Sequence, residues 1–490
     1  MHKTMISEKV KRKNLIYQMY PAANGTFEDM SELVKRYIHK LRPDYIWLSP
    51  IFKSPWIDGG YDVSDYYQVD ERFGSLEDFD KFVQTCADYH IGVLLDLPVN
   101  HTSTEHDWFK WSVDAKSGSE KYADYYLWMK TPNNWRSMFG GSACKYNSQR
   151  EEYYLHLFDK TQADLNWRSA DVRREFRDII EYWTEKHSVA GFRVDMCNII
   201  FKKSLKNGWE PIFPGVLQFF QSEETLCVLS SLFSGKSFFT MGEIGGGELY
   251  HRKHLRDITD TVLDTAYNAA QMDVFDTFIA RKNKIPHRWY KRWIKYFLKW
   301  SSEPTHVVML ENHDSPRAVS RFQADPMALA VLQFATPSNT VCIYQGQEIG
   351  TKNPILPEKI SEYEDIESRR RYKGLIMHGY FPSEAMEVVR YFSRDNARKP
   401  VDWREWERQA GRKVTKSVLK TYLKMIDIWR NYPDLQNPDG HSRVTDVCFK
   451  KRGKIAWYMV GNLEVKVDLT GDSESHVLDT ENDIIVLSTR

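Results

Sequence analysis

The stretch Ala190-Gly191-Phe192-Arg193-Val194-Asp195-Met196 is apolar apart from one arginine and one carboxylate. Its length and composition predict a short buried strand. Side chains two positions apart in a strand point to the same face, so Arg193 and Asp195 are expected side by side. A neighbouring guanidinium favours the ionised form of a carboxylate, which is the form that a nucleophile needs. Such a pair alone is more often a salt bridge at the end of a strand. Whether Asp195 is catalytic therefore has to be judged from the rest of the chain.

Seven other short apolar runs occur along the chain, most of them followed by a stretch with helical periodicity such as Ser75–Tyr89 or Ala170–Lys186. Ser75 followed by Asp78 resembles the capping box that opens a helix. Continuous apolar runs indicate strands buried on both faces, as in a parallel sheet. Eight strand–helix units on one parallel sheet predict an α/β fold, the (β/α)8 or TIM barrel. The expected strands are Asn14–Tyr20, Asp44–Pro50, Ile91–Pro98, Gly191–Asp195, Ser237–Gly242, Asp260–Asp264, His306–Leu310 and Thr340–Tyr344.

Two segments lie outside this repeating pattern. The region between the third strand and its helix, residues 101–166, is rich in Trp, Tyr, Asn and Gly and is too long for an ordinary loop. We expect an inserted subdomain there that forms one wall of a cleft. The chain after residue 432 contains short strand-like segments such as Ile455–Val460 and Ile484–Leu487, which predict a small C-terminal β-domain, a β-sandwich. The predicted domains are the barrel at 1–100 and 167–432, the insert at 101–166 and the β-domain at 433–490.

Composition and charge argue against several classes of partner. The 490 residues include 68 basic and 67 acidic side chains, a net charge of +1, which gives no electrostatic reason to bind nucleic acid or a membrane surface. Residues 1–14 do not read as a signal peptide, and no window has the apolar length of a transmembrane helix. We therefore predict a cytoplasmic protein, whereas the oligomeric state does not follow from the sequence. Without CxxC or CxxH spacing, the six cysteines are expected to be reduced core residues: Cys86, Cys144, Cys197, Cys227, Cys342 and Cys448.

Polar side chains gather where the predicted strands end. Functional groups of a (β/α)8 barrel lie at the carboxyl ends of its strands, and several acids with two histidines at one rim are hard to explain by solvation. Glycoside hydrolysis with retention of configuration needs two carboxyl groups about 5 Å apart, one as nucleophile and one as acid/base. Asp195 and Glu243 end adjacent strands and would face a common mouth. The polar residues in question are Asp96, Asn100, His101, Asp195, Glu243 and Glu311–Asp314.

The surroundings of these acids suggest different tasks. Glu243 lies among apolar residues, from Phe239 to Ile244, which are expected to raise its pKa toward that of a general acid. Asp314 follows His313, and both are placed to hydrogen-bond the hydroxyls of a sugar and to favour its cation-like transition state. The reaction requires neither a metal nor a cofactor.

A series of ordered motifs connects this chain to a known family. They are Tyr17–Pro21, Gly60–Tyr66, Asp96–His101, Gln162–Trp167, Gly191–Asp195, Gly242-Glu243, Glu311–Arg317 and Arg394–Arg398. On these motifs the chain resembles glycoside hydrolase family 13, the α-amylase family. Within that family it is most similar to the exo-acting branch of oligo-1,6-glucosidases, dextran glucosidases, trehalose-6-phosphate hydrolases and α-glucosidases. The resemblance covers nearly all of the barrel and the insert.

The resemblance implies roles at the matching positions. It makes Asp195 the nucleophile, Glu243 the acid/base and Asp314 the stabiliser of the transition state. It also implies a closed subsite for the non-reducing glucose, which admits only a chain end. The residues of that subsite would be Asp58 paired with Arg394, Tyr61 as the stacking platform, and His101, Arg193 and His313 along its walls.

Three departures from the family pattern refine this reading. The loop Pro21–Asp29 lacks the alternating acids of a calcium-binding loop, so no metal is predicted there. Asn198-Ile199 stands where endo-amylases have a Lys-His pair, which argues against an endo-amylase. Met196, after the expected nucleophile, is neither the valine typical of α-1,6 cleavage nor the threonine or alanine typical of α-1,4 cleavage; its size leans toward the valine type.

Three functional hypotheses follow. The first is a retaining exo-acting α-glucosidase that releases terminal glucose from short α-glucosides through a covalent glucosyl-enzyme. The second uses the same donor site to pass glucose to another sugar, as a transglucosidase or sucrose isomerase does. The third is a non-catalytic relative such as a transporter-associated subunit, but those resemble a barrel behind a membrane anchor with eroded acids, whereas this chain retains all three acids. The preferred linkage and whether the substrate is phosphorylated stay open.

Overall fold

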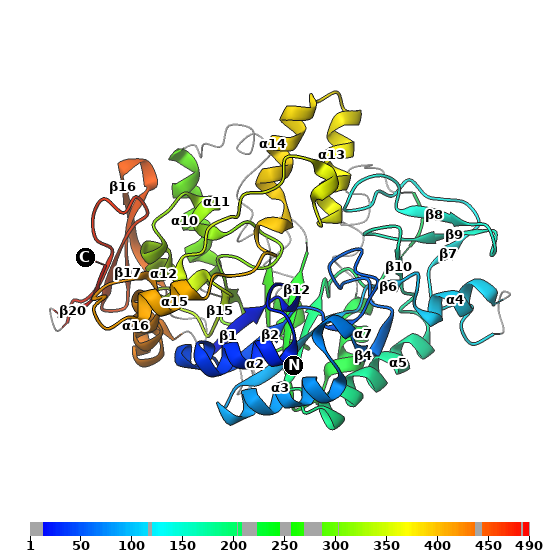
Figure 1. Ribbon diagram of the computed structural model, residues 1–490, viewed down its shortest axis with the longest axis horizontal. Coiled ribbons are helices and arrows are strands. Elements are labelled where there is room, and N and C mark those ends of the chain that lie inside the picture. Colours follow the sequence, from blue (N-terminus) through cyan, green and yellow to red (C-terminus); the bar gives the residue numbers. More distant parts are fainter. Residues whose placement is uncertain are drawn as a thin grey trace.

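The computed structural model describes residues 13–115, 120–202, 204–207, 223–245, 256–268, 287–301, 303–436, 443–481 and 484–489. Its centre is a sheet of eight parallel strands in the order β13-β12-β11-β5-β2-β1-β15-β14. A parallel bridge between Ala266 and His306 brings the two edges of this sheet together, so the predicted (β/α)8 barrel is confirmed (Figure 1). The strands are β1 (Asn14–Met19), β2 (Tyr45–Leu48), β5 (Gly92–Pro98), β11 (Gly191–Asp195), β12 (Phe239–Ile244), β13 (Thr265–Asn268), β14 (Val307–Val308) and β15 (Thr340–Tyr344).

Seven of these strands overlap their predicted ranges, and the sixth prediction is wrong. Residues 260–262 form a turn, and the strand begins only at Thr265. The apolar residues that suggested a strand at 260–264 include Leu263, which is buried in the main core from this turn. The carboxylate of Asp264 accepts hydrogen bonds from the backbone N–H and the hydroxyl of Thr240. The turn is therefore fixed by its side chains, and the ladder starts one residue beyond them.

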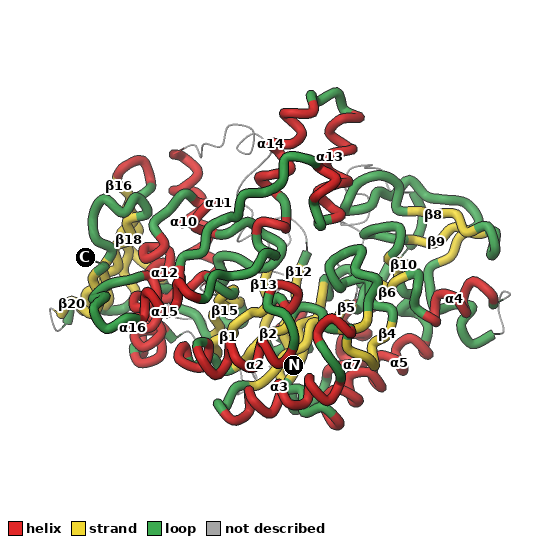
Figure 2. Tube along the Cα trace, viewed as in Figure 1, coloured by secondary structure: helices red, strands yellow, loops and turns green. Residues whose placement is uncertain are grey.

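Amphipathic helices enclose the strands (Figure 2). In α3 (Leu76–Asp88) the buried residues Phe79, Phe82, Val83 and Cys86 recur with helical spacing and face the barrel. The predicted capping box is present. The Ser75 hydroxyl oxygen accepts a hydrogen bond from the Asp78 backbone N–H, and the Asp78 carboxylate accepts one from the Ser75 backbone N–H. The other α-helices described outside the insert and the later helical hairpin are α2 (Phe27–Arg36), α5 (Ala170–Glu181), α7 (Glu223–Phe233), α10 (His287–Ser301), α11 (Ala318–Phe322), α12 (Pro326–Phe334), α15 (Arg404–Ala410) and α16 (Val418–Asn431).

The insert and the C-terminal region carry the remaining strands. In the insert, β6 (His101–Ser103) pairs with β10 (Gln162–Asp164), and α4 (Asp107–Asp114) precedes a sheet of order β7-β9-β8. The predicted C-terminal β-domain contains five antiparallel strands, β16 to β20 in sequential order, between Val444 and Ser488. Its described strands form one sheet that contacts helices α10, α12 and α16. The second layer of the expected sandwich is therefore helical. The three strands of the insert are β7 (Trp128–Met129), β8 (Cys144–Asn147) and β9 (Glu152–Leu155), and those of the C-terminal sheet are β16 (Val444–Lys450), β17 (Ile455–Val460), β18 (Leu463–Asp468), β19 (His476–Asp479) and β20 (Ile484–Ser488).

A helical hairpin after β15 was not foreseen from the sequence. It consists of α13 (Ile366–Met377) and α14 (Pro382–Phe392) and projects from the body of the molecule (Figure 1). Along the described residues, no helix combines the length and apolar character that crossing a bilayer requires. The segment 1–12, which the signal-peptide prediction concerned, lies outside the described residues.

The cysteines are unpaired, as predicted, but only part of the core prediction holds. Cys86, Cys197 and Cys342 are buried, whereas Cys144 is half-buried and two others are exposed. The prediction that Cys227 and Cys448 belong to the core is therefore wrong, because both are exposed.

The barrel wall is tightly packed at Gly191, the first residue of β11. A Cβ atom at this position would lie 1.9 Å from the carbonyl oxygen of Phe239 on the neighbouring strand. Backbone atoms cannot yield as a flexible side chain can. Only glycine therefore lets β11 and β12 approach in the register that places Val194 beside Gly242.

We expect Gly191→Ala to destabilise the protein by at least about 3 kcal/mol, because the new methyl group must displace backbone in a packed core. Thermal unfolding would measure the loss. Gly374→Ala is the matched control: Gly374 lies inside α13 with no atom near its missing Cβ, and alanine there should add up to about 1 kcal/mol of stability. A Gly191→Ala protein as stable as wild type would show that the wall is less tightly packed than described.

Candidate active site

A single buried guanidinium joins the acids at the carboxyl ends of the central strands. Arg193 Nη1 donates to Asp96 Oδ1 and Asp195 Oδ1, each at 2.6 Å, and Nη2 donates to Glu243 Oε2 at 2.5 Å. The Tyr267 hydroxyl oxygen accepts from Nη2 at 2.7 Å and from Nε at 3.1 Å. Strand register brings these groups together, because Arg193 lies beside Asp96 and Glu243 lies beside Tyr267. The two amino groups of one guanidinium therefore bind both Asp195 and Glu243.

The charges around Arg193 do not balance. Burial and the negative charges of Glu243 and Asp96 raise the pKa of Asp195 well above its usual range, although Arg193 opposes the shift. Burial likewise raises the pKa of Asp96 to about 6. Arg193 acts in the predicted direction, since it lowers the pKa of Asp195, but burial and the two neighbouring carboxyl groups outweigh it. Three carboxyl groups share one guanidinium, so the ionisation of each depends on the other two.

A second chain of hydrogen bonds orients Asp314. Gln18 Nε2, an amide nitrogen that can only donate, lies 2.7 Å from His313 Nδ1, so the hydrogen of the neutral ring is on Nε2. That atom lies 3.0 Å from Asp314 Oδ2 and 2.6 Å from the Tyr61 hydroxyl. The Tyr61 hydroxyl donates in turn to Asp96 Oδ2 at 2.8 Å. His313 thus connects the Arg193 cluster to Asp314.

Different interactions set the protonation states of Asp314 and His313. Burial lowers the pKa of His313 to about 4, although Asp314 opposes the shift. Burial also works against ionisation of Asp314, but the His313 N–H and the guanidinium groups of Arg398 and Arg394 outweigh it. They hold the pKa of Asp314 well below its usual range, and Arg398 Nη2 lies 2.7 Å from Asp314 Oδ1. Asp314 is therefore an anion beside a neutral imidazole.

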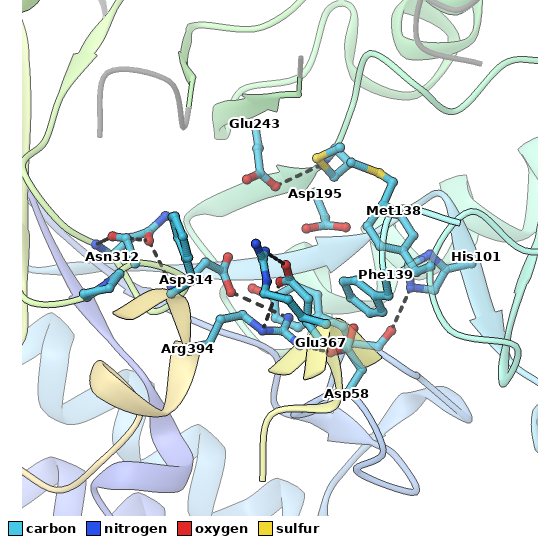
Figure 3. A pocket seen from close by; sticks show the side chains of 17 residues that line it. Asp58, His101, Met138, Phe139, Asp195, Glu243, Asn312, Asp314, Glu367 and Arg394 are labelled. Atoms are coloured by element: carbon cyan, nitrogen blue, oxygen red, sulfur yellow. Dashed lines mark hydrogen bonds and ion pairs between the residues drawn. The ribbon is translucent and has the colours of Figure 1, made fainter. Parts of the chain in front are cut away.

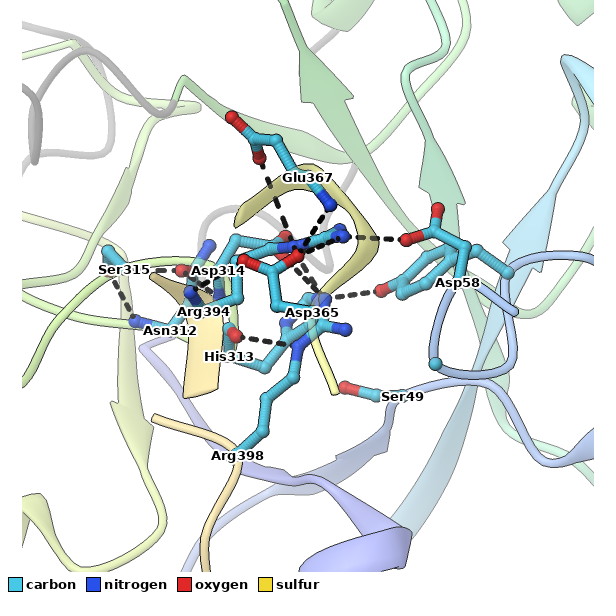
Figure 4. Close-up of polar contacts among 12 residues, drawn as sticks. Ser49, Asp58, Asn312, His313, Asp314, Ser315, Asp365, Glu367, Arg394 and Arg398 are labelled. Carbon is cyan, nitrogen blue, oxygen red and sulfur yellow. Dashed lines mark hydrogen bonds and ion pairs between the residues drawn. The ribbon is translucent and has the colours of Figure 1, made fainter. Parts of the chain in front are cut away.

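The far end of the site is closed by an ion pair between distant segments (Figure 4). Arg394 Nη2 donates to Asp58 Oδ1 at 2.7 Å, and Arg394 Nε donates to Asp365 Oδ1 at 2.8 Å. Gln162 Nε2 donates to the other oxygen of Asp58 at 2.9 Å and lies 3.0 Å from His101 Nε2. The predicted pairing of Asp58 with Arg394 is present.

These groups surround a pocket of about 280 Å³ (Figure 3). Asp195, Glu243 and Asp314 all line it, and so do four of the six predicted subsite residues: Asp58, Tyr61, His101 and Arg394. Arg193 and His313 do not line it; both side chains are fully buried behind it. They hold the acids in place, which corrects the expectation that they line the sugar subsite.

Several pocket residues were missed from the sequence. Met138, Phe139 and Phe158 come from the insert, and Glu367, Arg371 and Phe392 come from the helical hairpin. The insert was expected to form a wall, but no motif singled out its aromatic residues. In the hairpin the signal was the charged run from Glu364 to Arg371, in which Asp365 pairs with Arg394.

The described residues contain no group of three His, Cys, Asp or Glu side chains arranged to hold a metal ion. In the loop where calcium was considered, Asp29 Oδ2 accepts hydrogen bonds from the Thr26 backbone N–H and hydroxyl, each at 2.8 Å. This carboxylate caps α2. That no metal or cofactor takes part stays a prediction.

Comparison with known proteins places the chain in a family. A model of the α-amylase catalytic domain matches residues 21–442. The chain belongs to glycoside hydrolase family 13. The Escherichia coli (strain K12) trehalose-6-phosphate hydrolase is 31% identical over 493 residues, which is 86% of each chain. The Parageobacillus thermoglucosidasius oligo-1,6-glucosidase is 35% identical over 440 residues, covering 81% of this chain and 75% of that protein.

Solved structures agree with this family assignment. The trehalose-6-phosphate hydrolase of Bacillus licheniformis has a TM-score of 0.79 at 27% identity, covering 93% of this chain and 89% of that one. The isomaltulose synthase of Erwinia rhapontici NX5 has a TM-score of 0.80 at 26% identity, covering 95% and 91%. As a member of family 13, the protein is a glycoside hydrolase, and the predicted family resemblance is confirmed.

The state of His313 makes stability depend on pH. Its pKa is about 4 in the folded protein and about 6.5 in an unfolded chain, so between these values the unfolded state binds a proton that the folded state does not. Stability should therefore fall as the pH falls from 6.5 toward 4. In His313→Asn this contribution is absent, and we expect the melting temperature to fall less over that range than in wild type.

Thermal unfolding at a series of pH values would measure the difference. His378→Asn, which changes an exposed histidine after α13, is the control and should follow the wild-type profile. Parallel profiles for His313→Asn and wild type would contradict the neutral, buried state of His313.

Proposed function

We propose that this protein is a retaining, exo-acting α-glucosidase that removes the terminal non-reducing glucose from short α-glucosides. The observation that carries the proposal is the pairing of Asp195 and Glu243 on one guanidinium, at the wall of a pocket whose far end is closed. Two carboxyl groups that share one guanidinium suit the short spacing of a retaining enzyme, in which displacement proceeds through the protein itself.

In the first step, Asp195 would attack the anomeric carbon and form a covalent glucosyl-enzyme. Glu243 would give its proton to the glycosidic oxygen as the bond to the leaving sugar breaks. In the second step, Glu243 would take a proton from water, whose oxygen would replace Asp195 at the anomeric carbon and release glucose. The cycle starts with Asp195 ionised and Glu243 protonated, and no metal or cofactor enters either step.

Asp314 would stabilise the positive charge that develops on the sugar. Its ionised state follows from the N–H of His313 and the guanidinium groups of Arg398 and Arg394. An anion fixed before the reaction begins costs no reorganisation at the transition state. Because its side chain is still about one third exposed, Asp314 is available to bound hydroxyl groups.

The closed end supports exo action. Asp58, Arg394, Tyr61 and His101 bound a space of about 280 Å³, at the small end of ligand sites and suited to one hexose. A longer chain could not continue past the Asp58–Arg394 ion pair. Relatives named as oligo-1,6-glucosidases and trehalose-6-phosphate hydrolases support a terminal glucose as the donor.

Transfer of glucose to a second sugar is the alternative, favoured by the structural similarity to isomaltulose synthase. Assays with maltose, isomaltose, sucrose, trehalose and trehalose 6-phosphate would test both. A hydrolase yields free glucose, whereas a transferase yields new linkages. Met196 lines the pocket, and its size favours cleavage of the α-1,6 linkage. If none of these sugars is converted, the proposed function is wrong.

Asp195→Asn should lower kcat by at least about 10⁴-fold, since an amide cannot form the glucosyl ester. Far-ultraviolet circular dichroism and thermal unfolding would check that the fold persists. Activity within tenfold of wild type would rule out Asp195 as the nucleophile.

Glu243→Gln should lose about 10²- to 10⁴-fold on natural disaccharides, the typical contribution of general acid catalysis. On aryl α-glucosides with acidic leaving groups the first step should be largely spared, because such groups depart without a proton. The ratio of the two losses is the measurement, and equal losses would contradict the acid role.

A further inference from the structure

Two walls of the pocket come from parts of the chain that are far apart. Phe139 and Phe158 belong to the insert, whereas Arg371 and Phe392 belong to the helical hairpin. Directly behind these residues an ion pair connects the walls: Arg370 Nη2 donates to Asp159 Oδ2. Asp159 follows pocket residue Phe158, and Arg370 precedes pocket residue Arg371. The ion pair is therefore one residue removed from the pocket on both sides.

Asp159 is held ready for this contact by its own turn. Its Oδ1 accepts hydrogen bonds from the Thr161 backbone N–H at 3.0 Å and hydroxyl at 2.9 Å. Its backbone N–H donates to Gln162 Oε1 at 2.9 Å, and its side chain is only 2% exposed. A carboxylate with this little exposure requires a cationic or hydrogen-bonded partner, and Arg370 provides the cation.

The same turn reaches the closed end of the pocket. While Gln162 Oε1 accepts from Asp159, its Nε2 donates to Asp58 and lies beside His101. A displacement of the turn would therefore move Gln162 and change its contacts with Asp58 and His101 on the insert side of the pocket. By contrast, Asp195 and Glu243 are positioned by barrel strands and by Arg193, with no contribution from the turn.

The hairpin has little apolar anchoring on the α13 side. Ser368 is the one buried residue of α13, whereas α14 buries Ala385, Met386, Val388 and Val389. Tyr372 of α13 packs, half-buried, against the cluster that contains Met386 and Val389; beyond that contact, the position of α13 depends on polar contacts to its neighbours. In that setting an ion pair to the insert has a larger effect than it would between two helices with a common core.

From these contacts we infer that Arg370 is a positioning residue: paired with Asp159, it holds the hairpin against the insert and so fixes the two walls around the bound sugar. This inference rests on the proposed function, which places an α-glucoside in this pocket. Since the acids are held independently, loosening the wall weakens substrate binding and leaves the bond-breaking steps nearly unchanged.

The test compares Arg370→Gln, Asp159→Asn and the double variant with wild type on the best disaccharide of the panel above. Each single variant should raise KM about tenfold, as expected for a displaced binding wall, while kcat changes less than about threefold. The double variant should be no worse than the weaker-binding single variant, because both remove the same interaction. Arg369→Gln is the matched control, since Arg369 donates to the backbone oxygens of Tyr363 and Glu364 in its own segment and should leave KM unchanged.

A second measurement does not depend on turnover. Amide hydrogen exchange in Ile366–Met377 should accelerate in Arg370→Gln but not in Arg369→Gln. Unchanged KM, additive effects in the double variant, a fall confined to kcat, or unchanged exchange would each overturn the role of Arg370. A wild-type protein inactive on the whole panel would instead refute the proposed function, and hydrogen exchange would still decide whether Arg370 holds the hairpin.

Discussion

One guanidinium in the barrel interior determines where the acids of this protein can lie. Arg193 is fully buried, and a buried cation is tolerated only when its hydrogen-bonding capacity is used. Here Asp96, Asp195, Glu243 and Tyr267 use it, and each belongs to one of four adjacent strands, β5, β11, β12 and β13. Strand register and charge pairing therefore support one another: a slip in any of these strands would leave an ion without its partner.

Two clusters with different charge states result. Around Arg193, burial and neighbouring acids raise the pKa of Asp195, whereas around Asp314 the guanidinium groups of Arg398 and Arg394 keep a carboxylate ionised. Tyr61 and His313 lie between the clusters and are hydrogen-bonded to both. The site thus combines carboxyl groups on a shared guanidinium with a fixed anion, which is the combination that the proposed glycosidase chemistry uses.

Much of this arrangement could be predicted from the sequence, and the failures have physical causes. Continuous apolar strands and acids at their ends defined the barrel and the three central acids, because both patterns are local in sequence. The sixth strand was misplaced since Leu263 is buried from a turn and mimics a strand residue. Arg193 and His313 were assigned to the sugar subsite because a motif does not show which side of a pocket wall a side chain occupies.

The hairpin was missed for a related reason. Helix α13 has no fully buried apolar side chain, so it lacks the periodicity by which a packed helix is found in a sequence. The pocket residues Glu367 and Arg371 lie on it and were missed with it. Likewise Phe139 and Phe158 belong to the insert, whose strands are short and whose fold depends on contacts between residues distant in the chain.

The ion pair between Asp58 and Arg394 joins residues 336 positions apart, and this separation affects how the protein comes into being. A nascent chain that has emerged only as far as the eighth strand already possesses Asp195, Glu243 and Asp314, but its sugar compartment still lacks an end wall. Recognition of a hexose would therefore begin only when synthesis is almost complete. A sugar that binds there can stabilise the finished protein but not its partly made forms.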